Sequence, residues 1–556
     1  MAKVTFKNQT GKTPELFPIN IFDKISENHP VRLVDSIVDN LDISDIVKLY
    51  RGGGCSAYHP RMMVKVLFYS YLSNVYSCRK IAKALTENIH FMFISGNSTP
   101  DFRTINEFRG KILKEKIKDL FAEVVKMLVE LGYVSLDVQY IDGTKIEAKS
   151  NKYTFVWKGS VEKYKEKLET KINTILSDIE TSIQSDNQEL NKEELPKKIN
   201  SEELKEKLSE LNKKLKEPTK KQAKELQKLQ QEHLPRLEKY EKDLKILGNR
   251  NSYSKTDTDA TFMRMKEDHM KNGQLKPAYN PQISTENQFI THVSIHQKPN
   301  DTNTLESHLD GFEKAYQKQS KEVIADAGYG SEENYEMLEN KEITAYVKYN
   351  YFHKEQKRKM KDDPFLVHNL FYNKEQDFYV CPMGQRMENV GSGKRTSSNG
   401  YESQVSYYQA KRCEGCPLRG QCHQAKENRR IEVNHRLNEL KTKARKLLIS
   451  EKGLEHRSKR PIEVEAVFGQ LKSNNKFNRF TFKGLEMVEL EFLLMALGHN
   501  FRKMSVKGGN HSKINLKIKI NASKFRIEIE IFFIKASRNY FSNNLNVNHH
   551  SIKFAA

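Results

Sequence analysis

Between residues 276 and 350, segments with the composition of β-strands alternate with segments that have the periodicity of helices. The strand-like segments are NQFITHVSIHQ, KEVIADAG and ITAYVKYN, and the helix-like segments between them are DTNTLESHLDGFEKAYQK, opened by Asp301, and SEENYEMLEN, capped by Ser331. Strands that are separated by a helix usually pair in parallel through right-handed crossovers. This stretch therefore predicts the fold class of the centre of the chain, a mixed α/β sheet.

The segments on either side of this stretch are predicted to be mainly helical. Residues 1–130 carry apolar residues at helical spacing, as in VRLVDSIVDNLDI. Residues 160–250 are rich in Lys, Glu and Leu with almost no glycine, and their apolar residues step by threes and fours between prolines. They predict an antiparallel helical hairpin or a small coiled-coil arm. Residues 353–435 are predicted to be irregular, and residues 461–503 to be helical again.

The chain is strongly basic. Its 556 residues include 94 Lys and Arg against 72 Asp and Glu, a formal net charge of +22. Such an excess favours a polyanionic partner, because neutralising phosphates releases condensed counterions. Basicity alone does not separate nucleic acid from an anionic membrane surface or a ribosomal site. No run approaches the ~18 apolar residues of a membrane span, and the start MAKVTFKNQTGKTPELFP has no secretory-signal features. We therefore expect a cytoplasmic protein.

One basic segment near the N-terminus, SCRKIAKALTENIHF, is similar to half of a helix-turn-helix motif. In that interpretation the following cations contact DNA phosphates: Arg79, Lys80, Lys83, Arg103 and Arg109. The alternative is a small helical bundle with a solvated basic face. The sequence favours the two interpretations about equally.

Three acidic residues lie where metal-dependent chemistry needs them. Asp142 ends the strand-like VQYID, and Gly143 allows a close approach to it. Asp326 follows a short buried-type strand, at the carboxyl end where ligands of open α/β sheets bind. Glu465 lies on the helix PIEVEAVFGQLKSN. Each alone could be an ordinary turn or surface residue. Together they could hold two divalent ions, and an all-oxygen ligand set suits magnesium or manganese.

Glu463 and Glu465 compete for the third position. Two residues are about 200° apart on a helix, so only one of them can face the aspartates. The apolar stripe of this helix consists of Val464, Val467, Phe468 and Leu471. Glu465 flanks the stripe on the same side as Lys472, a cation suited to a DNA phosphate. The pattern predicts that Glu465 joins the aspartates and that Glu463 does not.

Four of the six cysteines lie close together in the sequence: Cys381, Cys413, Cys416 and Cys422. A Cys-x-x-Cys pair gives two thiolates the spacing for tetrahedral zinc, and two further thiolates would complete the site. The remaining spacing is unusual, and His423 is an alternate ligand. The segment predicts one structural zinc, with free thiols as the alternative. Cys55 and Cys78 are interpreted as ordinary buried residues.

The order of these motifs resembles that of the DDE-type transposases of bacterial insertion sequences. Similar segments run from about residue 14 to residue 503 and include YIDGTKIEAKSNKYTFVW, SKTDTDATFMRMK, VIADAGYGSEENYEML and RPIEVEAVFGQLKSNNKF. The resemblance implies a ribonuclease-H-like catalytic core whose triad is Asp142, Asp326 and Glu465. It also implies two magnesium or manganese ions per active site, cleavage and strand transfer of DNA, and a homo-oligomer in the DNA complex.

The chain departs from this family around the glutamate. In many of these enzymes a Tyr and an Arg precede the Glu in a signature that ends in Lys. Glu465 and Lys472 keep that spacing, but the Tyr and Arg positions are taken by Ser458 and Pro461. Two nearby cations could substitute in phosphate binding: Arg457 and Arg460.

The loop SKTDTDATFMRMK lies near the active site according to the same resemblance. Asp257 and Asp259 in this loop are rival metal ligands by chemistry alone, although turn carboxylates are the more common interpretation.

These patterns predict the following regions: a helical DNA-binding region at 1–130, a first part of the catalytic core at 131–350 with the helical insert at 160–250, a Cys-rich insert at 353–435, a C-terminal helical part of the core at 436–504, and a tail of undefined structure at 505–556. Within the tail, INLKIKI and FRIEIEIFFI alternate like strands. Two other function classes remain open, a metal-dependent nuclease without strand transfer and a catalytically inactive, transposon-derived DNA-binding protein.

Overall fold

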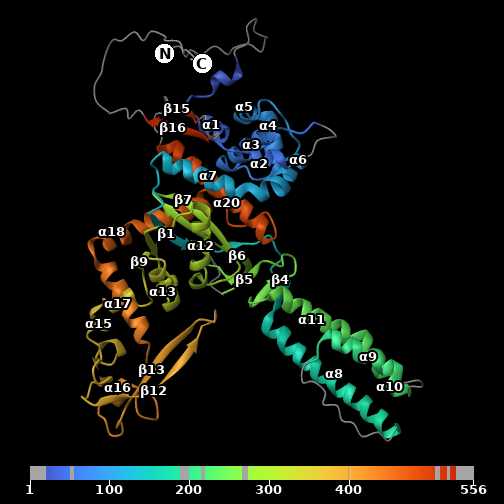
Figure 1. The fold of residues 1–556 in the computed structure, drawn as a ribbon, viewed down its shortest axis with the longest axis vertical. Coiled ribbons are helices and arrows are strands. Elements are labelled where there is room, and N and C mark those ends of the chain that lie inside the picture. The colour runs from blue at the N-terminus through green and yellow to red at the C-terminus, as the bar shows by residue number, and fades with distance from the viewer. Residues whose placement is uncertain are drawn as a thin grey trace, which may run out of the picture.

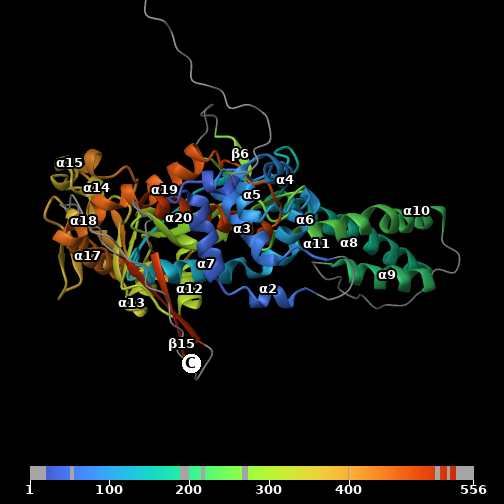
Figure 2. The ribbon, with the colours of Figure 1, turned by 90° about the horizontal axis from the view of Figure 1, so that it is seen from above.

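A computed structural model describes residues 20–50, 56–187, 199–214, 219–265, 273–397, 400–507, 514–521 and 526–533. A central α/β part lies below a group of N-terminal helices (Figure 1). A helical arm and a β-rich insert extend from the centre on opposite sides (Figure 2). None of the helices in the described ranges has the length and apolar character that crossing a membrane requires.

The central sheet is built around these strands: β1 (Val138–Gly143), β6 (Leu275–Glu286), β7 (Phe289–His296), β8 (Glu322–Ala325) and β9 (Thr344–Val347). Their order is β7–β6–β1–β8–β9. Strands β1, β8 and β9 are parallel neighbours, and β6 runs antiparallel to β1. The short strands β2 (Ile146–Glu147) and β5 (Thr261–Arg264) also pair with β6. The mixed α/β class is therefore confirmed.

Strand β6 is long, yet the sequence did not predict it as a strand. Pro277 and Pro281 lie within it, and proline removes a backbone donor and is rare inside sheets. The strand tolerates them because its partners change along its length. β5 pairs with the part around Pro277, whereas β7 pairs with the part from Asn280 onward.

Helices α12 (Leu305–Tyr316) and α13 (Glu332–Asn340) separate β7, β8 and β9, as predicted. Ser331 caps α13 by accepting the backbone N–H of Asn334. The sequence predicts that Asp301 opens this helix, but the structure shows that Asp301 does not cap α12. It begins a short 3₁₀ turn, and its carboxylate accepts hydrogen bonds from the neighbouring strand β6 instead.

The N-terminal region is helical, as predicted, with these elements: α1 (Pro30–Asn40), α2 (Ser44–Lys48), α3 (Pro60–Leu72), α4 (Cys78–Glu87), α5 (Ile89–Ser95), α6 (Phe102–Glu107) and α7 (Lys114–Glu130). They share one apolar core with the C-terminal helix α20 (Leu485–Lys507). A side chain at Gly498 would lie 2.8 Å from the carbonyl carbon of Tyr71. Glycine there lets α20 contact the backbone of α3, while β7 packs against α20 as well.

The predicted helical arm consists of α8 (Lys158–Asn187), α9 (Ser201–Lys214), α10 (Lys220–Lys228) and α11 (Leu234–Leu247). Helix α11 packs against α8 and α9, and leucine and isoleucine side chains give the arm its own core. A π-helical turn joins α10 to α11 just before Pro235, which lacks a backbone donor. At the base, β3 (Phe155–Trp157) pairs with β4 (Ser252–Ser254). Pro196 and Pro218 lie outside the described residues.

Residues 353–435 were predicted to be irregular, and the structure corrects this. They contain an antiparallel sheet of β10 (Phe371–Asn373), β11 (Phe378–Val380), β12 (Arg386–Thr396), β13 (Glu402–Ala410) and β14 (Arg430–Val433). Short helices also lie in or next to this region: α14 (Phe352–Glu355), α15 (Arg358–Lys361) and α16 (Arg419–Cys422). Most side chains of β12 are exposed, so the strand lacks the alternation that reveals a half-buried strand.

After the insert, α17 (His435–Ile449), α18 (Glu451–Arg460) and α19 (Ala466–Gly469) lead back to the centre. In the tail, β15 (Ile514–Asn521) and β16 (Arg526–Phe533) pair with each other in antiparallel register. The two alternating segments therefore form strands, as their sequence indicates.

Candidate active site

Asp142 lies on the central strand β1 and is only 7% exposed. The next residue, Gly143, is tightly enclosed. A Cβ atom there would overlap Nε2 of Gln282 and would lie 2.7 Å from Oδ1 of Asp301. Only glycine fits this contact, so the sequence Asp-Gly brings the backbone of β1 close to the polar side chains of its neighbours.

Asp326 follows β8, the parallel neighbour of β1. Its carboxylate accepts the backbone N–H of Gly328 at 2.8 Å and so caps the 3₁₀ turn Ala327–Tyr329. Because parallel neighbours end at the same edge of a sheet, Asp326 and Asp142 lie at the same edge, as the sequence predicts.

Glu465 lies on a π-helical turn, Pro461–Glu465, between α18 and α19. Helix α18 is anchored to the sheet through His456. Nδ1 of His456 lies 2.9 Å from the hydroxyl of Tyr140, and its Nε2 lies 3.1 Å from Oε2 of Glu322. The predicted apolar stripe is buried in this segment: Val464, Val467, Phe468 and Leu471.

The three carboxylates converge on a single buried cation, the guanidinium of Arg460. Its Nη2 lies 3.2 Å from Oδ2 of Asp142 and 3.8 Å from Oδ2 of Asp326. Its Nη1 lies 2.9 Å from Oε1 of Glu465. Arg460 is 6% exposed. Acidic residues from three distant parts of the sequence thus share one positive charge.

The π-helical turn explains why Arg460 reaches this position. On an α-helix, residues four apart lie on one face. Arg460 precedes Glu465 by five positions, and the intervening turn closes its backbone hydrogen bond over five residues. The wider turn takes up one extra residue. Arg460 therefore meets Glu465 from five positions away, although the family's arginine position, here Pro461, lies four positions before the glutamate. The other substitute, Arg457, instead lies over the ring of Phe352 at 5.1 Å.

Glu463 faces away from this cluster. It is 8% exposed, and its Oε2 accepts the backbone N–H of Gln288 at 2.6 Å. Burial is the main cause that raises the pKa of its carboxyl group. Of the two candidate glutamates, the structure therefore brings Glu465, and not Glu463, to the aspartates.

Asp301 is a fourth carboxylate beside the cluster, and the sequence interpretation missed it. Asn280 and Gln282 donate side-chain hydrogen bonds to its Oδ1 at 2.8 and 2.9 Å. The buried hydroxyl of Tyr329 donates to Gln282. Burial raises the pKa of Tyr329 well above its usual value, and the charges of Asp301 and of the two aspartates of the cluster raise it further. The polar segment PNDTNT contains this aspartate, but its pattern predicts the start of a helix and not a carboxylate beside the active site.

Lys348 borders the carboxylates, since its charge interacts with those of Asp326 and Glu465, and Lys472 contacts the chain shortly after β1. Burial lowers the pKa of Lys348, and the charges of Arg460 and Arg457 lower it further. Lys472 is partly buried, and its Nζ donates to the backbone carbonyl of Lys145 at 3.1 Å. Lys348 therefore places a basic group at the edge of the cluster, which suits an approaching phosphate.

Asp257 and Asp259 hold the start of α20 in place. The hydroxyl of Tyr279 lies 3.0 Å from both carboxylate oxygens of Asp257, and Gly484 donates its N–H to Asp257 at 3.2 Å. Leu485 donates its N–H to Asp259 at 2.9 Å. These contacts favour the interpretation as structural turn carboxylates over that as metal ligands.

The N-terminal cations differ in their exposure. Those exposed on α4 and α6 are Arg79, Lys80, Lys83 and Arg103. Arg109, which was also expected to contact phosphates, is instead 4% exposed and donates to the carbonyl of Tyr76 at 2.9 Å. Its position inside the helical bundle excludes it from a DNA-facing surface.

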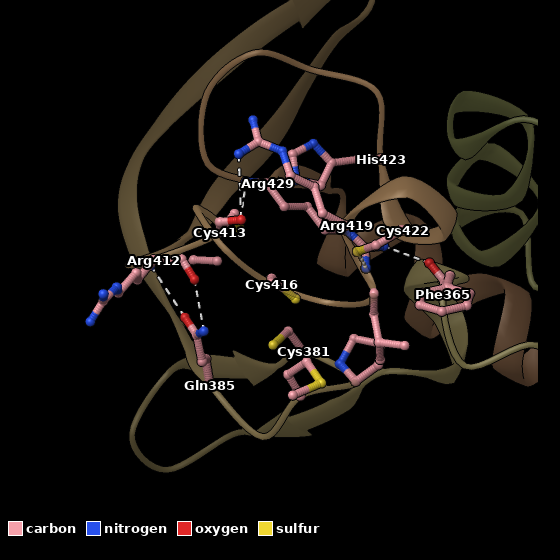
Figure 3. A pocket seen from close by; sticks show the side chains of 14 residues that line it. Phe365, Cys381, Gln385, Arg412, Cys413, Cys416, Arg419, Cys422, His423 and Arg429 are labelled. Carbon is pink, nitrogen blue, oxygen red and sulfur yellow. Dashed lines mark hydrogen bonds between the residues drawn. The ribbon is translucent and has the colours of Figure 1, made fainter.

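Four cysteines line one small cavity of about 20 Å³ in the insert: Cys381, Cys413, Cys416 and Cys422 (Figure 3). Arg429 donates its backbone N–H to the sulfur of Cys413 at 3.3 Å and a guanidinium N–H to that of Cys422 at 3.1 Å. Both ring nitrogens of His423, which also lines the cavity, are buried without a hydrogen-bond partner among the described residues.

No group of three or more His, Cys, Asp or Glu side chains in the described ranges is already arranged as a metal site. At the carboxylates, the guanidinium of Arg460 lies between the acidic groups. These donors nevertheless fit a hard divalent ion, since three carboxylates already surround one cation.

At the cysteines, the zinc prediction is not confirmed. Cys78 is buried as expected, and Cys55 lies outside the described part of the chain.

Comparison with protein families gives two matches. A family model described as "Transposase DDE domain" matches residues 380–505, and one described as "Transposase domain (DUF772)" matches residues 19–111. The first range contains Glu465 and the four cysteines, and the second contains most of the N-terminal helices. Asp142 and Asp326 lie outside both ranges. Among curated proteins the chain has no match.

Proposed function

This chain belongs to the DDE transposases, and on that premise we propose that it cuts DNA at the ends of a mobile element and joins the freed ends to target DNA, acting as a homo-oligomer. The family implies a DNA-binding, phosphodiester-cleaving enzyme that uses divalent metal ions and is built on a ribonuclease-H-like core. The mixed sheet β7–β6–β1–β8–β9 agrees with such a core. Asp142, Asp326 and Glu465 are our candidates for the metal-binding triad.

The observation that supports this assignment is the convergence of the three carboxylates on Arg460. Gathering acidic groups at one point is costly, because like charges repel and partly buried charges lose hydration. Two strand ends and a distant helical turn nevertheless bring their carboxylates together around one cation. A site whose function is to bind cations explains why this cost is tolerated.

The side chains have distinct roles in the proposed reaction. The three carboxylates would hold two magnesium or manganese ions, which when bound activate the attacking oxygen and stabilise the leaving oxygen. Arg460 neutralises the carboxylates and, once exchanged for metal, offers a planar guanidinium suited to a DNA phosphate. Lys348 adds a basic group at the edge of the cluster, Lys472 adds one beside the chain that follows β1, and the exposed cations of α4 offer contacts to the bound DNA end.

Cleavage and joining of DNA that carries the inverted repeats flanking the coding sequence test this proposal. We expect magnesium-dependent cleavage and strand transfer by the wild type, and loss of both in Asp142→Asn and Asp326→Asn with end binding retained. Asp310→Asn is a matched control, because Asp310 is an exposed residue of α12 that pairs with Lys341. Full activity in both triad variants would overturn the mechanism.

The same assay separates the two rival functions. A nuclease without strand transfer would cleave the end DNA but form no joined product. A catalytically inactive, transposon-derived protein would bind the end DNA and neither cleave nor join it.

We further propose that the cysteine cavity holds one structural zinc ion. Four sulfur atoms and the unpartnered imidazole of His423 line a single small cavity among the described residues, and these are donors that zinc prefers. The N–H groups that Arg429 directs at two of the sulfurs would stabilise them as thiolates.

A further inference from the structure

A large cleft of about 960 Å³ lies between the sheet of the insert and helix α17. Its lining includes four tyrosines and four Lys or Arg side chains: Tyr349, Tyr351, Tyr372, Tyr379, Lys361, Arg395, Lys441 and Arg445. We refer to it as the tyrosine cleft. Its volume is at the upper end of the roughly 300–1,000 Å³ that is usual for ligand sites.

The acidic residues of the tyrosine cleft already have partners. Glu332 accepts a hydrogen bond from Asn434 at 2.6 Å, and Glu355 accepts one from the hydroxyl of Tyr349 at 2.8 Å. Glu432 forms an ion pair with Arg395 at 2.8 Å. Glu432 is thus neutralised by an ion pair, and the other two carboxylates are held by hydrogen bonds from neutral groups.

The other three Lys and Arg side chains of the lining are less engaged than Arg395. Within the ranges that the structure describes, none of Lys361, Lys441 and Arg445 forms an ion pair. Lys441 lies over the ring of Tyr349, with its Nζ 5.7 Å from the ring centroid. Lys441 and Arg445 are four residues apart on α17, so they lie on the same face of the helix. The four Lys and Arg side chains of the lining outnumber its three glutamates, so the cleft has a small excess of positive charge, which favours an anionic ligand.

Tyr351 presents an aromatic ring to the cleft. It is 59% exposed, and its backbone has a φ of 73°, in the left-handed region that a bulky residue rarely adopts. Such a conformation costs free energy and is typical of functional positions. Tyr372 adds a second aromatic surface and stacks on Tyr379 with ring centroids 4.5 Å apart.

The tyrosine cleft begins next to the candidate active site. Lys348, whose charge interacts with those of Arg460 and Asp326, directly precedes Tyr349 in the chain. The chain then enters α14, where the ring of Phe352 packs against the guanidinium of Arg457 on α18. The segment that lines the cleft therefore also contacts the helix that carries Arg460.

We infer that the tyrosine cleft binds single-stranded DNA that leaves the active site beside the cut phosphate, an inference that rests on the proposed function. Cations without ion pairs attract the phosphates, and the exposed ring of Tyr351 can stack on a base without regard to sequence. The bases of a duplex are already stacked on each other and cannot reach such rings. A tyrosine-lined cleft, unlike a flat basic surface, therefore selects an unpaired strand.

Fluorescence anisotropy of the full chain with a labelled single strand of roughly 12 nucleotides, a length typical of such sites, tests this inference. We expect the double variant Lys441→Ala/Arg445→Ala to weaken single-strand binding by about tenfold or more while leaving binding of a duplex of the same sequence unchanged. Lys446→Ala is the matched control, since Lys446 is exposed on the same helix and does not line the cleft.

A second set of variants tests the aromatic contribution. Tyr351→Asn removes the ring but suits the left-handed backbone, because asparagine adopts it readily. It should weaken single-strand binding, whereas Tyr351→Phe should retain it. Unchanged single-strand binding in the double variant and in Tyr351→Asn, or an equal loss of single-strand and duplex binding, would overturn the inference.

The two proposals fail in different ways. If the wild type cleaves end DNA but the cleft variants bind single strands normally, only the inference about the cleft is wrong. If the variants lose single-strand binding as expected but the wild type cleaves no end DNA, the cleft is a single-strand site and the proposed transposition reaction is wrong.

Discussion

The carboxylate cluster and the cysteine cavity are both candidate metal sites, but different groups engage their ligands in the protein alone. At the carboxylate cluster, the guanidinium of Arg460 contacts Asp142, Asp326 and Glu465. At the cysteine cavity, two of the sulfurs accept hydrogen bonds from Arg429, and the ring nitrogens of His423 lack partners among the described residues.

The difference follows from the acidity of the two kinds of ligand. Ordinary carboxyl groups ionise at about pH 4 and are charged at neutral pH, whereas ordinary thiols ionise at about pH 8.5 and remain neutral. A cluster of carboxylates therefore needs a counter-ion before any metal arrives, and a cluster of thiols does not. Metal should enter the first site in exchange for an arginine and the second in exchange for protons.

The largest effect on metal binding is expected at the cysteines. Protein purified without chelator should carry about one zinc per chain, and Cys413→Ser or Cys416→Ser should remove nearly all of it and lower the melting temperature. Elemental analysis and thermal unfolding measure this, with Cys78→Ala as the control because Cys78 lies in the helical region. Zinc-free wild-type protein would contradict the zinc proposal without affecting the catalytic one.

A smaller effect is expected at the carboxylates. Arg460→Gln removes the competing cation, so manganese should bind to the metal-free protein about tenfold more tightly, a change of about 1.4 kcal/mol. Calorimetry or electron paramagnetic resonance of Mn²⁺ binding measures this independently of activity.

Arg457→Gln is the control for that measurement, since Arg457 lies on the same helix but packs against Phe352. If Arg460→Gln left manganese affinity unchanged or weakened it, Arg460 would not occupy the place of the metal.

These two sites also show how far the sequence could predict the molecule. The edge of the sheet that holds both aspartates followed from short strands ending in Asp, and the choice of Glu465 over Glu463 followed from helical periodicity. The role of Arg460 did not follow, because periodicity assumes a regular α-helix and a π-helical turn shifts the register by one residue.

The differences elsewhere have a similar origin. Asp301 joins the cluster through hydrogen bonds to β6, and β6 itself was hidden by its prolines. The strands of the insert pair with one another without the regular alternation of buried and exposed residues. Such features depend on contacts between distant segments, which local patterns do not contain.

The smallest effect concerns Glu463, the buried glutamate outside the cluster. Burial raises the pKa of its carboxyl group above the usual 4.5 in the folded chain. The folded state then binds this proton more tightly than the unfolded state, so the stability it contributes is present at low pH and is lost as the pH rises through the raised pKa. Glu463→Gln should remove this loss.

Thermal unfolding of the wild type and of Glu463→Gln between about pH 4 and pH 7 measures this difference. The variant should gain stability relative to the wild type as the pH rises. A difference that does not change with pH would mean that Glu463 titrates normally.

The most direct test of the proposed active site compares Glu465→Gln with Glu463→Gln in magnesium-dependent cleavage of end DNA. Glu465→Gln should lower the cleavage rate by about 10³-fold or more, at the upper end of the cost of losing one electrostatic stabiliser, and should still bind the DNA end. Glu463→Gln should cleave at close to the wild-type rate. The reverse result for the two glutamates would contradict the assignment of the carboxylate cluster as the catalytic centre.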